Sequence, residues 1–252
     1  MKNLTFQIAL GLCFFQGVIC LVEPASAAIE VDHGVYAELL NRYVKDGKVD
    51  YRGFKSEEAR LDQYLKVLEG TDPKKLLRDE QFAFYINAYN AWTIKLILSA
   101  YPEIKSIRDL GNLFKSPWKK KLARIDGDIV TLDHIEHDIL RPLFKDPRVH
   151  FAINCASKGC PPLRAEPYRG AVLNEQLNDM AQAFINDDRY NRLEGRTLYV
   201  SRIFKWFGED FKDDIIGFFL KYARGALKNE LTLNPQEIKV RYLEYDWSLN
   251  GE

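Results

Sequence analysis

The sequence predicts an α+β fold, namely a single helix-rich domain with a small, mostly antiparallel sheet. Apolar residues recur at helical spacing through most of the first half of the chain. Segments with the alternating pattern of strands are few and short, and they suit antiparallel pairing. Helices therefore outnumber strands, which is typical of the α+β class. The chain contains no repeat, low-complexity tract or long linker, so we expect one compact unit.

The N-terminal residues 1–27 have the pattern of a secretory signal peptide. Lys2 precedes an apolar run over residues 8–22, and the small residues 25–27 suit signal cleavage. The run is shorter than the roughly 20 residues that cross a bilayer, so we expect no stable membrane insertion after cleavage. Residues 28–252 then form the single globular domain, in the periplasm or secreted.

The composition limits the partners that we expect. Acidic and basic residues balance at 36 each, so no net charge favours nucleic acid or an anionic membrane. The mature chain is long enough to bury a sizeable core without disulfides. We expect no cofactor, and the sequence does not indicate the oligomeric state.

The expected elements follow from periodicity, turn residues and caps. Thr131 is expected to cap a helix that Pro142 ends near Arg141, and Asp126-Gly127 is the strongest hairpin signal. Helices are expected at residues 35–43, 57–70, 76–102, 131–141, 173–187, 203–211 and 213–227, and strands around the 126–127 turn and at 149–154, 196–201 and 238–247.

Two amides interrupt the most apolar helix. From Phe82 to Leu98 this helix is apolar almost all round, so we expect it to be buried, with Asn87 and Asn90 on one face. A buried amide without a partner costs on the order of 1 to 3 kcal/mol, so both must be hydrogen bonded. They either fix loop backbone or orient a catalytic or substrate group.

Cys155 and Cys160 are the two cysteines of the mature chain, and three interpretations of them remain open. A disulfide would close only a very short loop and contribute little. A metal site with His150 lacks the Cys-x2-Cys spacing of zinc sites and needs a distant fourth ligand, so we expect no metal. A catalytic thiol needs a base and an orienting group nearby.

His137 is the better candidate for that base. If residues 149–154 form a strand, His150 and Cys155 point to opposite faces, so His150 is only a secondary candidate for the base. Cys160 is likewise a secondary candidate for the reactive thiol. On the helix before this strand, Asp133, His137 and Arg141 lie at four-residue steps and share a face. A carboxylate one turn from the imidazole would fix its tautomer.

Glu136 is adjacent to His137 but lies about 100° round the helix, so it joins only by reaching sideways. Either Glu136 or Asp133 is expected to orient the imidazole, and a solvated charged face is the structural alternative. In the cysteine loop, small residues let backbone N–H groups approach an oxyanion. Lys158 and Arg164 would lower the pKa of the thiol.

Six ordered blocks of the chain resemble the domain of unknown function 547 family. Together they run from about Phe82 to Asn250. The blocks are "FYINAYNAWTI", "SIRDL", "TLDHIEHDILR", "VHFAINCASKGCPPLR", "SRIFKWFGEDF" and "YLEYDWSLN".

The resemblance implies a fold distantly similar to papain-like cysteine peptidases and transglutaminase-like proteins, and an association with glutathione or a similar thiol peptide. The family's shared positions fall on Asn87, Tyr89, Asn90, Glu136, His137, Arg141, Cys155 and Pro161. In plant relatives a serine replaces the second cysteine and the position of His150 varies, which ranks Cys155 and His137 first. Papain-like enzymes place cysteine before histidine, whereas here the order is reversed.

We therefore expect a cysteine-dependent hydrolase or acyl-transferase that acts on a small peptide or thiol peptide. Cys155 would attack a carbonyl, His137 would move the proton, and Glu136 or Asp133 would orient it. Asn87 and Asn90 would be supporting donors, while Arg141 and Arg164 would bind a substrate carboxylate. The alternative is a non-catalytic binding module with a Cys155–Cys160 disulfide.

Overall fold

A computed structural model describes residues 30–112, 115–233 and 235–251 of the chain. The predicted signal peptide, residues 1–27, lies outside the described residues. Helices predominate, with short two- and three-stranded sheets, which confirms the α+β class. No helix within the described residues is long and apolar enough to span a membrane.

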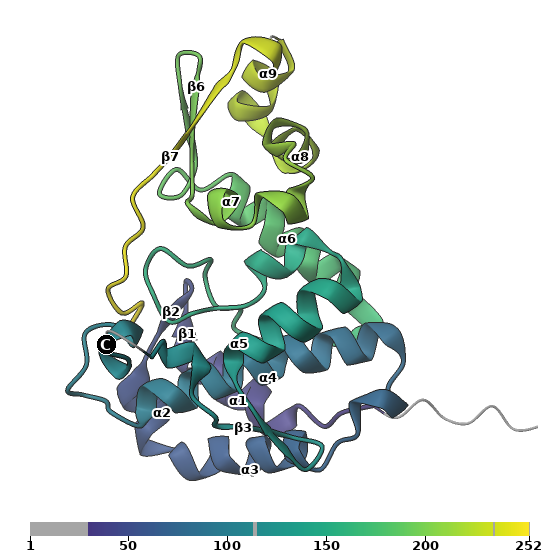
Figure 1. The fold of residues 1–252 in the computed structure, drawn as a ribbon, viewed down its shortest axis with the longest axis vertical. Coiled ribbons are helices and arrows are strands. Elements are labelled where there is room, and N and C mark those ends of the chain that lie inside the picture. Colours follow the sequence, from purple (N-terminus) through teal and green to yellow (C-terminus); the bar gives the residue numbers. More distant parts are fainter. Residues whose placement is uncertain (1–29, 113–114, 234, 252) are drawn as a thin grey trace, which may run out of the picture.

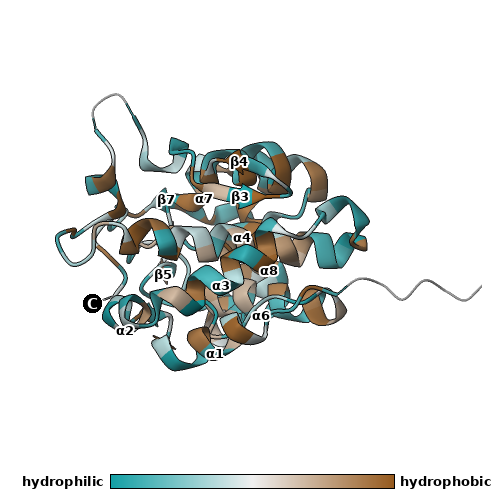
Figure 2. Cartoon of the chain, turned by 90° about the horizontal axis from the view of Figure 1, so that it is seen from below, coloured by the Kyte–Doolittle hydropathy of each residue, from teal (hydrophilic) through white to brown (hydrophobic). Residues whose placement is uncertain are grey.

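The lower part of the molecule in Figure 1 is a body of helices around α4 (Arg78–Leu98). As its sequence predicts, α4 is buried on almost all sides, and Figure 2 shows it in the middle of the other elements. The remaining elements of this body are α1 (Gly34–Tyr43), β1 (Val44–Lys45), β2 (Lys48–Val49), α2 (Tyr51–Ser56), α3 (Glu58–Glu69), β3 (Ala123–Ile125), β4 (Asp128–Val130), α5 (Leu132–His134) and α6 (Leu173–Ile185).

The upper part of Figure 1 holds a three-stranded sheet and three short helices. β5 and β6 pair antiparallel, but β7 pairs parallel to β6, so the sheet is mixed. The predicted helix over residues 213–227 is broken at Ala223, whose backbone is extended. These elements are β5 (Arg192–Glu194), β6 (Thr197–Val200), α7 (Ile203–Trp206), α8 (Ile215–Tyr222), α9 (Gly225–Leu233) and β7 (Lys239–Tyr242).

Short helical turns fill the connections. They are η1 (Pro73–Lys75), η2 (Ile107–Leu110), η3 (Pro117–Lys119), η4 (Ile135–Phe144), η5 (Pro147–Phe151), η6 (Gly170–Val172), η7 (Gly208–Phe211) and η8 (Pro235–Glu237).

The predicted hairpin at Asp126-Gly127 and the predicted helix cap at Thr131 are both confirmed. Asp126 and Gly127 have φ values of 49° and 78° and join β3 to β4. Thr131 caps the next helix by accepting a hydrogen bond from the His134 N–H at 2.9 Å. Local residue chemistry thus fixes the entry to the helix that carries His137.

Pro142 does not end that helix, contrary to the sequence prediction. The helix continues as η4, a π-helix, to Phe144, and Pro142 lies inside it on the exposed side. In an α-helix the proline ring clashes with the carbonyl four residues back. A π-helix pairs residues five apart, and its wider turn relieves this clash.

The predicted strand at residues 149–154 is also wrong. Asp146 accepts a hydrogen bond from the Arg148 N–H at 2.9 Å, and Pro147 occupies the first position of η5. These are helix-start signals. The apolar run that resembles a buried strand is a buried 3₁₀ turn followed by irregular chain. The alternation that separated His150 from Cys155 therefore does not apply.

Candidate functional site

The cysteine loop, residues 155–160, is fixed on one side by α4. Asn90 donates from Nδ2 to the Ala152 carbonyl at 2.9 Å, and its Oδ1 accepts from the Asn154 N–H at 2.8 Å. Asn154 in turn accepts from the Ala156 N–H at 2.9 Å and donates to the Pro161 carbonyl at 2.7 Å. Two buried amides thus hold both ends of the loop.

The C-terminal segment, residues 243–251, fixes the other side. In Figure 1 it runs down the edge of the molecule from β7 to the C-terminus near α2. Lys158 N–H and Gly159 N–H donate to the Ser248 and Asp246 carbonyls, each at 2.8 Å, and Asn250 N–H donates to the Ala156 carbonyl at 3.1 Å. Two backbone N–H groups of the loop that is expected to supply oxyanion donors are therefore already bonded to this segment.

Two hydroxyl groups surround the Cys155 sulfur. The Sγ lies 3.0 Å from Ser157 Oγ and 3.1 Å from Tyr245 Oη, and the two oxygens are 3.1 Å apart. Cys155 N–H donates to the Cys160 Sγ at 2.9 Å, and both cysteines are free thiols. Three groups that each donate and accept form a closed triangle.

This triangle changes the acidity of the thiol. Burial alone raises the pKa of Cys155, but hydrogen bonds from Cys160, Ser157 and Tyr245 outweigh it and lower the pKa to about 7. Burial and the adjacent Cys155 raise the pKa of Cys160 well above its usual value. Cys155 is therefore the more acidic thiol of the pair.

A pocket of about 220 Å³ opens at this sulfur. Of the candidate catalytic and substrate-binding residues that the sequence predicts, six meet here: Asp133, Glu136, His137, His150, Cys155 and Cys160. The full lining is Tyr89, Ser116, Trp118, Asp133, Glu136, His137, His150, Ile153, Cys155, Cys160, Pro161, Ile203, Trp206, Phe207, Tyr245 and Trp247.

Glu136 is the buried carboxyl of the pocket, with 9% of its surface exposed. Burial raises its pKa to about 7, and the negative charge of Cys155 acts in the same direction. Three interactions oppose this rise, namely the charge of His137, a hydrogen bond from Tyr89 and the charge of Arg141. Glu136 and Cys155 therefore titrate in the same pH range and influence each other.

The two histidines are oriented by different partners. His137 is exposed, and its Nδ1 lies 3.0 Å from Arg141 Nη1, so the ring accepts from the guanidinium and carries its proton on Nε2. His150 is buried against Phe207, and its Nε2 lies 2.7 Å from Asp210 Oδ2. Burial lowers the pKa of His150 and favours the neutral ring.

No carboxylate among the described residues hydrogen bonds to the His137 ring. Asp133 lines the pocket, and the i, i+4 partner of His137 is Arg141 rather than an acid. The hydrogen bond along the predicted helix face therefore joins His137 to the Arg141 guanidinium and not to the Asp133 carboxylate. The carboxylate that contacts a histidine on this helix is Asp138, at 2.7 Å from His134.

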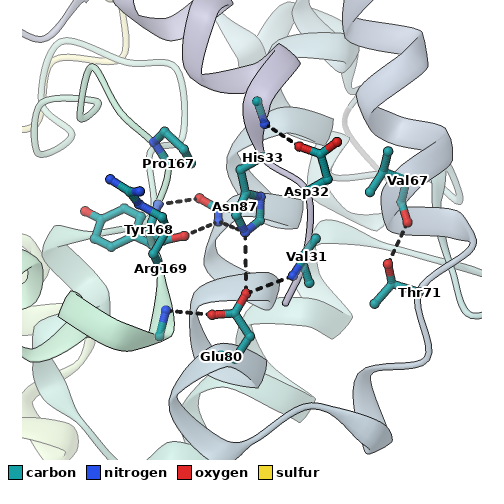
Figure 3. Close-up of polar contacts among 12 residues, drawn as sticks. Val31, Asp32, His33, Val67, Thr71, Glu80, Asn87, Pro167, Tyr168 and Arg169 are labelled. Carbon is teal, nitrogen blue, oxygen red and sulfur yellow. Dashed lines mark hydrogen bonds and ion pairs between the residues drawn. The ribbon is translucent and has the colours of Figure 1, made fainter. Parts of the chain in front are cut away.

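The residues expected to bind substrate have other partners. Asn87 donates to the Tyr168 carbonyl at 2.7 Å and accepts from the Tyr168 N–H at 2.9 Å (Figure 3). Asn90 bonds in the same way to the backbone of Ala152 and Asn154. Both amides therefore fix loop backbone, which is the structural one of the two predicted roles, and neither lines the pocket.

The two arginines are also engaged elsewhere. Arg141 pairs with Asp210 at 2.6 Å and with Glu209, while Arg164 pairs with Glu166. Neither guanidinium lines the pocket. A substrate carboxylate in this pocket would therefore not meet them without rearrangement of these ion pairs.

Sequence reasoning missed the aromatic half of the site. Tyr245 and Trp247 come from the C-terminal segment and Trp206 from α7. The available signal was the block "YLEYDW", whose aromatic residues are too frequent for an exposed edge strand. In the parts of the chain that the structure describes, no three His, Cys, Asp or Glu side chains are grouped to hold a metal ion.

Comparisons with known proteins give one match. The family described as "Protein of unknown function, DUF547" matches residues 73–185, which include α4, η4 and the cysteine loop. The blocks around Trp206 and Tyr245 lie outside the matched residues. No curated protein and no solved structure matches the chain significantly, so a papain-like relationship has no support from known folds. The match over residues 73–185 supports the assignment of this part of the chain to the DUF547 family.

Proposed function

We propose that the protein is a cysteine-dependent hydrolase or acyl-transferase that acts on a small peptide or similar acyl compound. The observation that carries this proposal is the Cys155 thiol, whose pKa is lowered to about 7 where it faces a pocket. Thiolate, rather than thiol, is the attacking species, and near neutral pH a large fraction of this sulfur is ionised.

The second catalytic group is Glu136. Two negative charges in one pocket repel each other, so an ionised Cys155 favours a protonated Glu136. The pair then has one nucleophile and one acid at the same pH. A proton carrier works best when its pKa lies near the operating pH.

The chemistry balances with these two groups. The Cys155 thiolate attacks the carbonyl carbon, the bond to the leaving group breaks, and Glu136 gives its proton to that group. In the second step Glu136 takes a proton from water or an acceptor amine, which attacks the thioester and releases the thiolate. The hydroxyls of Ser157 and Tyr245, which contact the Cys155 sulfur, are the donors that we assign to the developing oxyanion.

His137 is assigned as a hydrogen-bond donor in this scheme. Its proton lies on Nε2 because Arg141 occupies Nδ1, and its interaction with Glu136 favours the carboxylate. It thereby stabilises the Glu136 carboxylate that exists after the first proton transfer and before the second. This differs from the role of proton carrier that the sequence suggests for His137.

The alkylation rate of Cys155 by iodoacetamide, measured against pH, tests the thiol. We expect a midpoint near pH 7, whereas an unperturbed cysteine titrates at about 8.5. His137→Ala should slow the hydrolysis of an activated ester by at least about tenfold. The matched control is His134→Ala, a histidine of the same helical segment that pairs with Asp138 and does not line the pocket. An alkylation midpoint like that of free cysteine, with equal hydrolysis by both variants, would contradict the proposal.

The rival function is a binding module with a Cys155–Cys160 disulfide. The two thiols are free, and Cys160 Sγ accepts a hydrogen bond from Cys155 N–H, which favours the enzyme. The mass of the mature protein before and after reduction separates the two functions. The predicted periplasmic or secreted location remains part of the proposal and rests on residues 1–27 alone.

A further inference from the structure

Five aromatic side chains form one wall of the Cys155 pocket. Tyr245 packs against Trp247 with ring centroids 4.5 Å apart and against Trp206 at 4.8 Å, and Trp118 lies 5.9 Å from Trp247. Phe207 completes this aromatic wall. The rings come from η3, α7, the residue after α7 and the C-terminal segment, which the fold brings together from distant parts of the sequence.

The acidic side chains that line the same pocket are Asp133 and Glu136, and no lysine or arginine lines it within the described residues. Glu136 is neutral while Cys155 is ionised, so the negative charges of the pocket are then those of Asp133 and the Cys155 thiolate. Asp133 makes no ion pair or hydrogen bond within the described part of the chain. Its charge is therefore available to a ligand.

The nearest run of cations lies outside the pocket. Lys119, Lys120 and Lys121 follow Trp118 but are exposed and do not line the cavity. Solvent and salt screen such exposed charges over about 8 to 10 Å. Asp133 and the Cys155 thiolate lie in the pocket and are partly removed from water, so their negative charges act more strongly on a group bound there.

On this basis we infer that the substrate of the proposed enzyme carries a cationic group, such as an ammonium or alkylammonium, that binds between the aromatic wall and Asp133. Aromatic faces attract cations, tryptophan most strongly, and nearby carboxylates add to this attraction. Two of these rings already lie near cations, because Arg108 is 5.3 Å from the Trp247 centroid and Arg141 is 5.1 Å from that of Phe207.

An anionic thiol peptide fits this pocket poorly. Its carboxylates would lie against Asp133 and the Cys155 thiolate, with Arg141 and Arg164 already paired to acidic residues. The substrate class therefore differs from the glutathione-like compound that the sequence suggests. The inference rests on the proposed function, because it takes Cys155 as the reacting atom.

Methanethiosulfonate reagents with one reactive head and different tails test the charge preference. The rate of Cys155 modification, followed by peptide mass, is compared for trimethylammonioethyl, sulfonatoethyl and methyl reagents, each relative to 2-mercaptoethanol. We expect the cationic-to-anionic ratio at Cys155 to exceed that of the reference thiol by about tenfold or more.

Three variants locate the preference, and two of them, Asp133→Asn and Asp138→Asn, form a matched pair. Asp133→Asn should lower the ratio several-fold, and Trp206→Ala should lower it as well. Asp138→Asn removes the same charge from the same helical segment, but Asp138 does not line the pocket, so the ratio should stay unchanged. Fast reaction with all three reagents and no charge preference, or an equal effect of both Asn variants, would overturn the inference while leaving an activated thiol. Slow reaction with every reagent would overturn the proposed function itself.

Discussion

At the scale of single residues, the acidity of Cys155 reflects a competition between burial and hydrogen bonding. Burial disfavours the thiolate, but Ser157, Tyr245 and Cys160 each donate a hydrogen bond to it. A hydrogen bond to a charged group contributes about 1.5 to 3 kcal/mol, so several together exceed the cost of partial desolvation. Tyr245 itself stays neutral, because burial raises its pKa well above 10.0.

Removal of the Tyr245 hydroxyl should therefore make Cys155 less acidic. We expect Tyr245→Phe to raise the pKa of Cys155 by about one to two units, because 1.36 kcal/mol corresponds to one unit. The pH dependence of iodoacetamide alkylation gives this pKa directly. Tyr242→Phe is the control, since Tyr242 lies on β7 and is 39% exposed. An unchanged alkylation midpoint in Tyr245→Phe would show that the phenol does not stabilise the thiolate.

The raised pKa of Glu136 should make the fold less stable as the pH increases. Its pKa is raised from 4.5 to about 7, so the folded state binds a proton that the unfolded state releases. The stabilisation is complete below pH 4.5 and is lost as the pH rises through 7. We expect Glu136→Gln to become more stable than the wild type over that interval, by up to about 3 kcal/mol. Urea unfolding from pH 4.5 to 8 measures the difference, and a difference that is constant with pH would refute the assignment.

At the scale of elements, α4 positions the site through its two amides. Asn87 and Asn90 lie almost one turn apart, and each exchanges two hydrogen bonds with loop backbone. Asn90 holds the chain that leads into Cys155, whereas Asn87 holds residue 168. A long buried helix therefore serves as the rigid support for a loop that has no regular structure.

The two asparagines provide a matched pair of variants. Asn87→Ala and Asn90→Ala should each destabilise the fold by about 2 to 4 kcal/mol, because two buried backbone groups lose their partners. Asn90→Ala alone should also slow alkylation of Cys155 at pH 7, since the loop loses its fixed geometry. Chemical unfolding and the alkylation rate measure the two effects. Equal alkylation rates in both variants would mean that Asn90 contributes stability only.

The elements also show where local sequence signals suffice. The burial of α4, the hairpin at Asp126 and the Thr131 cap follow from periodicity and side-chain chemistry, and all are confirmed. The run over residues 149–154 was misread because a short apolar segment suits a buried strand and a buried 3₁₀ turn equally. Pro142 was misread because a π-helix does not obey the α-helical rule for proline.

At the scale of the whole molecule, the site is closed by chain that is about 90 residues away in sequence. The C-terminal segment supplies Tyr245 and hydrogen bonds to the backbone of residues 156–159. No local pattern specifies such a pairing, which is why sequence reasoning found Cys155, Glu136 and His137 but not Tyr245 or the aromatic wall. Those three candidates came from residue chemistry and family resemblance, and the pocket brings them together.

Asn250 joins three parts of the molecule and tests this closure. Its Oδ1 accepts from the Tyr51 hydroxyl at 2.7 Å, and its Nδ2 donates to Asn154 Oδ1 at 3.1 Å. Asn250→Ala should cost about 2 kcal/mol in unfolding free energy and raise the pKa of Cys155 as the segment loosens. Asn41→Ala, on the exposed side of α1, serves as the control. An Asn250→Ala protein as stable and as reactive as the control would mean that the segment does not maintain the site.

The proposed reaction requires that Cys155 forms a covalent acyl intermediate. Mixing the protein with p-nitrophenyl acetate should release a burst of one p-nitrophenol per protein, with one acetyl group on the Cys155 peptide by mass spectrometry. The burst should disappear in Cys155→Ala and persist, more slowly, in Cys160→Ala. A burst that survives Cys155→Ala, or acetyl groups found on lysines and not on Cys155, would contradict the account.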